Sequence, residues 1–241
     1  MGGARRPAVN VAPSILSADF AELARDVECV AAQTDLLHVD VMDGHFVPNL
    51  TIGPPVVEAL HRHSPVYLDC HLMMTNPGRY LERFRDAGAS GCSVHVEVGG
   101  TAELIAQMRD LDLDVGLAVN PDVGFEQFAG YLGAVDLLLL MTVFPGFGGQ
   151  EFMSEVLPKI ERSAEEIRAQ GYHAVIQVDG GIDAETAPRC AAAGAAVFVA
   201  GSAIFGRAEP LTAAAALRQA VGGGAGGAQP WPSRRPRPES G

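Results

Sequence analysis

The segment Leu36-Leu37-His38-Val39-Asp40-Val41 continues as Met42-Asp43-Gly44-His45-Phe46-Val47-Pro48-Asn49, and its first half is an apolar run interrupted only by His38 and Asp40. Such a run is typical of a strand covered on both faces. Side chains two apart in a strand point the same way, so His38, Asp40 and Met42 share one face. The Asp43-Gly44 pair is typical of a turn. The imidazole and the carboxylate therefore lie where a buried strand gives way to a loop.

This His-Asp pair has two interpretations. It is half of a metal site, or it is a core histidine hydrogen-bonded to a neighbouring aspartate, because short motifs also arise by chance. A buried carboxylate without a partner costs roughly several kcal/mol, so some group has to neutralise Asp40. The spacing of the two residues alone does not decide between these interpretations. Other parts of the sequence are needed to do so.

Apolar runs alternate with amphipathic segments through most of the chain. Candidate strands lie at Asn10–Pro13, Leu36–Val41, Val66–His71, Gly91–Val96, Asp114–Val119, Val135–Met141, Ala174–Val178 and Ala196–Ala200. Helical patterns lie at residues 20–31, with Asp19 as the expected cap, and at Tyr80–Ala87, Thr101–Leu111, Val156–Gln170 and Ala184–Ala193. Eight strands separated by helices predict an α/β fold, a single (β/α)8 TIM barrel. A doubly wound sheet would have fewer strands and a glycine-rich turn after the first.

Composition excludes several functional classes. The chain has 241 residues and a formal net charge of -12, which argues against nucleic acid and anionic membranes as partners. No apolar run is long enough to span a bilayer, and no secretory signal is expected. The four cysteines are scattered through apolar stretches, where they are expected to be buried thiols. We therefore expect a reduced, cytoplasmic location.

The ends of the chain differ from its middle. We expect a flexible N-terminus over residues 1–8, the barrel over 9–221, and a disordered tail rich in Gly, Pro and Arg over 222–241.

Deleting the residues after Val221 should leave the melting temperature and the turnover number nearly unchanged, because a disordered segment makes no core contacts. Thermal unfolding and steady-state kinetics of the truncated chain measure this. A large drop in either quantity would mean that the tail docks on the barrel or bridges two subunits.

In a barrel the carboxyl ends of the strands meet at one face, where catalytic residues gather. The expected strand ends place two imidazoles and two carboxylates there, from His38, Asp40, His71 and Asp179. This mixed nitrogen and oxygen set suits one divalent transition metal such as Zn²⁺, Fe²⁺, Mn²⁺ or Co²⁺. His95 and Glu97 repeat the spacing and are expected to support the site rather than to ligate. The other histidines considered are expected at the surface: His61, His63 and His173.

Glycine-rich turns follow the last three expected strands, at residues 145–150, 179–182 and 200–203. Glycine lets backbone N–H groups approach an anion, and the turns after strands seven and eight are the recurrent phosphate position of this fold. Three such turns at one corner favour a phosphorylated ligand. Three methionines near strand ends either fill the core or form an apolar lid over a planar intermediate: Met42, Met73 and Met141.

From about residue 9 to 207 the chain resembles the ribulose-phosphate 3-epimerase family. The segments that carry the resemblance are Ala12–Phe20, His38–Pro55, Asp69–Met73, Pro145–Gln150, Val178–Ile182 and Val199–Phe205. The resemblance implies metal-dependent interconversion of D-ribulose 5-phosphate and D-xylulose 5-phosphate through an enediolate, with no nucleotide cofactor. A homo-oligomer is also expected. The chain departs from the family pattern at Gln33-Thr34 and at Phe144, which could alter the rim of the pocket.

The resemblance also assigns roles to residues. The metal ligands are expected to be His38, Asp40, His71 and Asp179, and the same two aspartates are expected to be the catalytic acid/base pair. The substrate-binding residues are expected to be Ser14, His71, Gly146, Phe147, Gly148, Gly149, Asp179, Gly180, Gly181, Gly201 and Ser202.

The reaction needs two acid/base groups on opposite faces of the substrate, and their pKa values have to split. A 3-epimerase of a phosphorylated hexulose such as allulose 6-phosphate would use the same site. Chemistry through a lysine Schiff base would need a lysine at a strand end, whereas Lys159, the only lysine, falls in a helical segment. A non-catalytic phosphate-binding protein would be expected to have lost one of the ligands.

Overall fold

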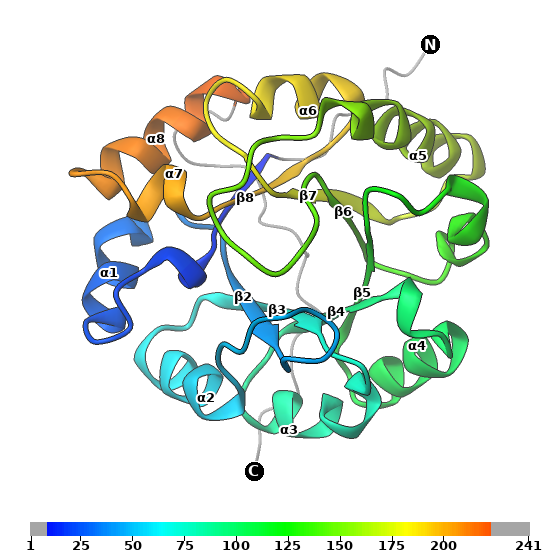
Figure 1. Ribbon diagram of the computed structural model, residues 1–241, viewed down its shortest axis with the longest axis horizontal. Helices are drawn as coiled ribbons and strands as arrows, with labels where there is room; N and C mark the ends of the chain where they lie inside the picture. The colour runs from blue at the N-terminus through cyan, green and yellow to red at the C-terminus, as the bar shows by residue number, and fades with distance from the viewer. Residues whose placement is uncertain (1–8, 223–241) are drawn as a thin grey trace.

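The eight candidate strands all form in the computed structural model, which describes residues 9–222. They pair in parallel into one sheet in the order β1-β8-β7-β6-β5-β4-β3-β2. Their bounds are β1 Asn10–Pro13, β2 Leu36–Met42, β3 Tyr67–Met73, β4 Gly91–His95, β5 Asp114–Val119, β6 Leu137–Met141, β7 Val175–Asp179 and β8 Val197–Ala200. The strands form a ring with the helices outside it, so the predicted (β/α)8 barrel is confirmed (Figure 1).

The ring closes where β1 meets β2. Ser14 and His38 form a parallel bridge, and Asp35 N donates to Val11 O. The Asp35 carboxylate accepts hydrogen bonds from Val11 N and from the Arg218 guanidinium of the last helix. This helix, α8 (Pro210–Ala220), therefore braces the seam between the first two strands.

The helices are α1 Leu23–Val30, α2 Pro54–His63, α3 Leu81–Asp86, α4 Thr101–Asp110, α5 Leu157–Gln170, α6 Ala187–Ala193, α7 Ser202–Phe205 and α8 Pro210–Ala220. Helices α1 and α3–α6 were predicted, whereas α2, α7 and α8 were not. Pro54 and Pro55 open α2, as is common for proline in the first turn of a helix. His61 and His63 lie in the last turn of α2 rather than in a connection, and both are exposed as expected.

Three predictions in or beside α1 were wrong. Asp19 does not cap this helix: Glu22 is the residue before it, and the Asp19 carboxylate accepts from Ala21 N in a turn of its own. Phe20, expected in the buried stripe, is 49% exposed because it precedes the helix. Cys29, expected to be buried, is also exposed, whereas the other cysteines are buried as predicted.

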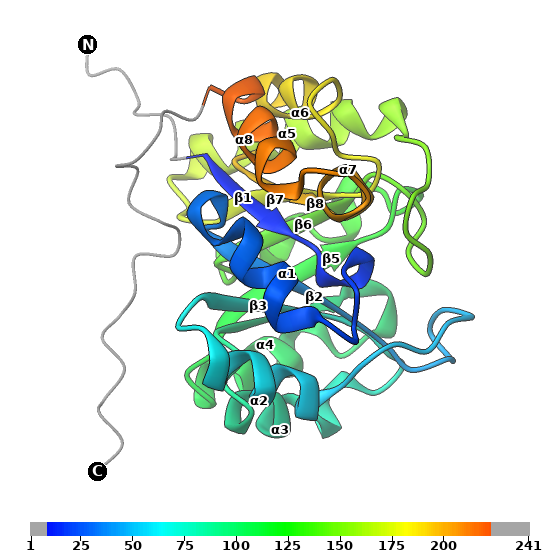
Figure 2. The same ribbon diagram turned by 90° about the vertical axis from the view of Figure 1, so that its left-hand side faces the viewer.

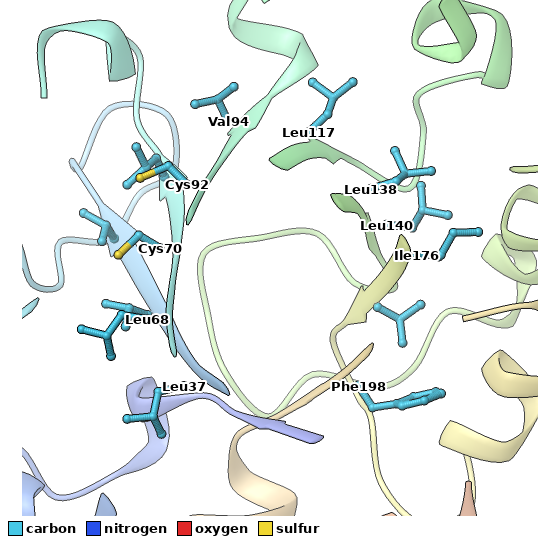
Figure 3. Packing of buried hydrophobic residues seen from close by; sticks show 14 of the residues in the cluster. Leu37, Leu68, Cys70, Cys92, Val94, Leu117, Leu138, Leu140, Ile176 and Phe198 are labelled. Carbon is cyan, nitrogen blue, oxygen red and sulfur yellow. The ribbon is translucent and has the colours of Figure 1, made fainter. Parts of the chain in front are cut away.

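Alternation along the strands sorts side chains between the inside and the outside of the ring. Figure 3 shows Cys70 of β3, Cys92 of β4 and Leu140 of β6 pointing outward into the apolar layer under the helices. The residues next to them point into the barrel. Pairing of β2 with β3 sets His38 beside Asp69 and Asp40 beside His71, so charged groups line the interior.

The loops after β2 and β6 project from the end of the barrel at which the strands finish (Figure 2). Among the described residues no helix is both long enough and apolar enough to cross a membrane. The flexible segment predicted for 1–8 and the tail predicted from 222 lie outside the described residues, apart from Gly222 itself.

Candidate metal centre and active site

Four side chains from three strands converge at the end of the barrel where the strands finish. His38 and Asp40 come from β2, His71 from β3 and Asp179 from β7, and one candidate ligand atom of each lies within 4.8 Å of all the others. His71 Nδ1 is 3.1 Å from Asp40 Oδ1. Asp179 Oδ2 is 3.9 Å from both His38 Nε2 and His71 Nδ1. The sequence predicted this set, and the fold brings it together.

The hydrogen bonds of His38 show what this cluster can hold. His38 Nδ1 lies 2.8 Å from Asp69 Oδ2 and is the nitrogen that donates. The other nitrogen, Nε2, is completely buried and has no hydrogen-bond partner among the described residues. It faces Asp40 Oδ1 at 3.4 Å. A lone pair and two carboxylates turned toward one point need a positive charge there, and a divalent cation fits.

The same charges act on the protons of the cluster. Without a cation, a proton on His38 Nε2 supplies this positive charge: burial opposes it, but Asp40 and Asp69 outweigh burial and raise the pKa of the ring well above its usual range. Burial likewise opposes ionisation of Asp40, but His38 and His71 overcome it and hold the pKa of this carboxyl well below its usual range. Asp40 is therefore a carboxylate at neutral pH.

Asp179 has the opposite environment. Burial and the nearby negative charge of Asp40 raise the pKa of Asp179 to about 7. Its side chain keeps 17% exposure, whereas that of Asp40 keeps 6%. The pKa values of the two carboxyl groups are thus split, as those of an acid and a base must be.

Ser14 was predicted to bind substrate, and its hydroxyl lies at the edge of the cluster. Ser14 Oγ donates to Asp40 Oδ2 over 2.6 Å. This leaves Asp40 Oδ1 turned to the two histidines and fixes the plane of the carboxylate.

A second layer of polar residues holds the cluster. Asp69 Oδ2 accepts from His38 and also from Gln177 Nε2 at 2.7 Å. On the other side, His71 Nε2 lies 2.8 Å from His95 Nε2. His95 and Glu97 were predicted as supporting groups, and neither belongs to the four-residue set.

A cavity of about 410 Å³ opens above the cluster. Its floor includes Asp40 and Asp179, while His38 and His71 lie below it with no exposed surface. The three methionines also line it, with Ser14 and the predicted turn residues Gly146, Phe147, Gly148, Gly149, Gly180, Gly181, Gly201 and Ser202. One cavity thus joins the candidate metal site to the three glycine-rich turns.

The turn after β7 shows why glycine is needed there. Gly180 has φ +118, and a Cβ on it would lie 2.4 Å from Val143 Cγ2. Thr142 Oγ1 holds this turn by donating to the carbonyl oxygens of Asp179 and Gly180. A side chain at Gly180 would push the turn, and Asp179 with it, away from its place.

Sequence analysis missed two cationic residues of the cavity, Arg189 and Arg207. Each arginine follows a glycine-rich turn along the chain. This position is the only feature of the sequence that could have indicated that they line the cavity. Both lie on the side of the turns after β7 and β8, where a positive charge would attract an anion.

Comparison with known proteins agrees with this site. A family model described as the ribulose-phosphate 3 epimerase family matches residues 10–205. The chain belongs to the ribulose-phosphate 3-epimerase family. It is 46% identical to the cytoplasmic isoform of ribulose-phosphate 3-epimerase from Oryza sativa subsp. japonica, over 90% of this chain and 96% of that one. It is 44% identical to the ribulose-phosphate 3-epimerase of Bacillus subtilis, over 87% of this chain and 98% of that one.

As a member of the ribulose-phosphate 3-epimerase family, the chain is an isomerase, as the sequence predicted. More distant solved structures share the fold. KGPDC from Streptococcus mutans in complex with D-R5P aligns with a TM-score of 0.69 at 15% identity, over 88% of this chain and 97% of that one. The 3-hexulose-6-phosphate synthase from Salmonella typhimurium aligns with a TM-score of 0.67 at 18% identity, over 88% of this chain and 98% of that one.

One departure from the ribulose-phosphate 3-epimerase pattern can now be located. Phe144 was expected to alter the rim of the pocket, but it is not among the described residues that line the cavity. Its side chain is 47% exposed, and its carbonyl oxygen accepts from Gln150 Nε2. The substitution therefore changes the outer surface of the loop after β6.

Proposed function

We propose that this protein epimerises C3 of D-ribulose 5-phosphate to give D-xylulose 5-phosphate, with Asp40 and Asp179 as the acid/base pair. The observation that carries the proposal is a cavity that is lined by both aspartates of the candidate metal centre and by three glycine-rich turns. Family membership and the names of the relatives support the substrate.

The two aspartates have complementary roles in this proposal. Asp40 is ionised and its Oδ2 is oriented by Ser14, so it can remove the proton from C3. Asp179, whose pKa is raised to about 7, can deliver a proton from the other side. The two come from β2 and β7, strands that are not neighbours in the sheet, as attack on opposite faces of one carbon requires.

We infer that His38, Asp40, His71 and Asp179 hold one divalent transition metal. When bound, the metal supplies Lewis-acid stabilisation of the negative charge that develops on the substrate oxygens. The residues around the cluster orient these ligands, and the methionines Met42, Met73 and Met141 cover the reacting carbon with apolar surface.

The turns at Gly146–Gly149, Gly180–Gly181 and Gly201–Ser202 line the part of the cavity that we assign to the phosphate. Backbone N–H groups at such turns bind an anion without a large charged side chain. The arginines Arg189 and Arg207 add positive charge beside them.

Gly201→Ala should raise KM for the phosphorylated ketopentose about tenfold, equivalent to about 1.4 kcal/mol of binding. The added Cβ would lie 2.5 Å from Ser17 Oγ and 3.3 Å from Ser17 Cβ, so either Ser17 or the turn after β8 would have to shift. Steady-state kinetics measure the change, and Gly130→Ala is the matched control because a Cβ there meets nothing within 4 Å. An unchanged KM in Gly201→Ala would remove this turn from the phosphate site.

A steady-state assay against D-ribulose 5-phosphate and allulose 6-phosphate tests the proposal. We expect kcat/KM to be higher for the pentulose phosphate. A higher value for the hexulose phosphate would favour the second candidate, which the same metal and phosphate residues would serve. Activity on neither would defeat both. A Schiff-base reaction is disfavoured because Lys159 Nζ donates to the carbonyl oxygens of Asn120 and Pro121 and does not line the described cavity.

We also propose a cytoplasmic location and a homo-oligomeric state. The scattered cysteines support the location, as does the name of the rice relative. Sedimentation of the purified chain would measure the oligomeric state.

A further inference from the structure

A buried line of three side chains runs from the candidate metal centre toward the loop after β4. His71 Nε2 lies 2.8 Å from His95 Nε2, and both rings are fully buried. His95 Nδ1 lies 3.3 Å from Glu97 Oε2. The Glu97 carboxylate is itself fixed, because Asn120 N donates to its Oε1 at 2.8 Å. The proposed reaction assigns no role to His95 or Glu97.

The contact between the two histidines determines where their protons lie. Two N–H groups cannot face each other across 2.8 Å, so one of the two Nε2 atoms donates and the other accepts. A histidine that ligates a metal presents a lone pair and carries its proton on the other nitrogen. Because His71 Nδ1 faces the cluster, His71 donates from Nε2 and His95 accepts.

The next contact follows from this assignment. A neutral His95 that accepts at Nε2 carries its proton on Nδ1, on the side of Glu97. This N–H makes no well-aligned hydrogen bond among the described residues, so the carboxylate acts on it mainly through its charge. Phe46, from the loop after β2, packs on the His95 ring with centroids 4.6 Å apart and covers it.

We propose that His95 and Glu97 are positioning residues, which fix the tautomer and the orientation of His71 so that its Nδ1 lone pair faces the metal. The inference rests on the proposed function in one respect, that the cluster binds a metal. The two ligand histidines are then held differently. A carboxylate, Asp69, orients His38 directly, whereas His71 reaches its carboxylate through a second histidine.

Metal affinity tests the role of His95. Zn²⁺ binding is measured by competition with a chromogenic chelator on the full chain and on His95→Leu, His95→Gln and Ser93→Ala. His95→Leu removes the acceptor and should weaken Zn²⁺ binding about 10- to 100-fold, the usual effect of losing such a partner. His95→Gln keeps an acceptor oxygen and should recover most of the affinity. Ser93 pairs with His71 across β3 and β4, but its hydroxyl hydrogen-bonds to neither histidine. Ser93→Ala therefore controls for a change beside His71 and should bind as wild type.

The outcomes separate this inference from the proposed function. Wild type that binds no Zn²⁺ would defeat the metal site itself. If wild type binds Zn²⁺ and a folded His95→Leu variant binds it equally tightly, only the positioning role is contradicted. If the leucine variant does not fold, the protonation of the histidine nitrogens in wild type still tests the inference. In the Zn²⁺-loaded protein labelled with ¹⁵N-histidine, nitrogen shifts should show His71 protonated at Nε2 and His95 at Nδ1. A His95 ring protonated at Nε2 would overturn the inference.

Discussion

His38→Ala and His71→Ala each lose the bound metal, and turnover falls by at least about a thousandfold. Purified wild type should carry about one divalent transition metal per chain. Each histidine supplies one of four ligand atoms gathered within 4.8 Å, and removal of either leaves Asp40 and Asp179 repelling each other without a full set of ligands. Elemental analysis of the purified variants measures the metal, and the epimerase assay measures turnover. An enolisation of this kind loses several orders of magnitude without charge stabilisation at the oxygens.

The control for these variants is His63→Ala. His63 lies in α2, is exposed, and contacts only Glu28 among the described ion pairs, so its loss should change neither metal content nor turnover. Thermal unfolding of all three variants separates metal loss from unfolding. Full activity of exhaustively demetallated wild type would contradict the metal-dependent mechanism.

Asp40→Asn and Asp179→Asn should each cut kcat by at least about a hundredfold, the low end for the loss of a general acid or base. Each should be needed in both directions, since the acid in one direction is the base in the other. Both residues are also expected metal ligands, so metal content has to be measured in the same preparations. Only a variant that retains metal reports on proton transfer.

Deuterium gives the clearer measurement of the aspartate roles. In deuterated water, wild type should place solvent deuterium at C3 of the product. A variant that lacks only the proton-returning group should still exchange the C3 hydrogen of the substrate without epimerising it. Product that keeps its original C3 hydrogen would contradict the scheme with two separate groups, and would favour a single shuttling group.

The barrel could be predicted because its strands are continuous apolar runs, each interrupted by polar residues only where a side chain points inward. The ligand set followed from the same pattern, since His38 and Asp40 are two apart in β2, and His71 and Asp179 lie toward the ends of β3 and β7. The helices α2 and α8 were missed for a physical reason. Histidine and arginine in the last turn of α2 resemble a polar connection, and the alanines of α8 give only a weak apolar stripe.

His95 and Glu97 were predicted to support the site, but the contacts that the supporting residues make could not be predicted. Gln177 and Asp69 meet across the barrel, from strands β7 and β3 that do not pair, and nothing local in the sequence relates them. The approach of His95 to His71 likewise depends on the register of β3 and β4 and on how each ring is turned. Residue type and spacing give the ligands, whereas the orientation of each ring comes only from packing.

The seam between β1 and β2 has a consequence for the order of folding during synthesis. Strand β1 pairs along its length only with β8, and its links to β2 are the Ser14–His38 bridge and the Asp35–Val11 hydrogen bond. At typical rates of synthesis, roughly ten seconds or more separate the emergence of β1 and of β8 from the ribosome. Asp179 also emerges late, so no nascent chain that lacks β7 can offer all four ligands. If the four residues bind a metal as proposed, the complete site can therefore form only after β7 has been synthesised.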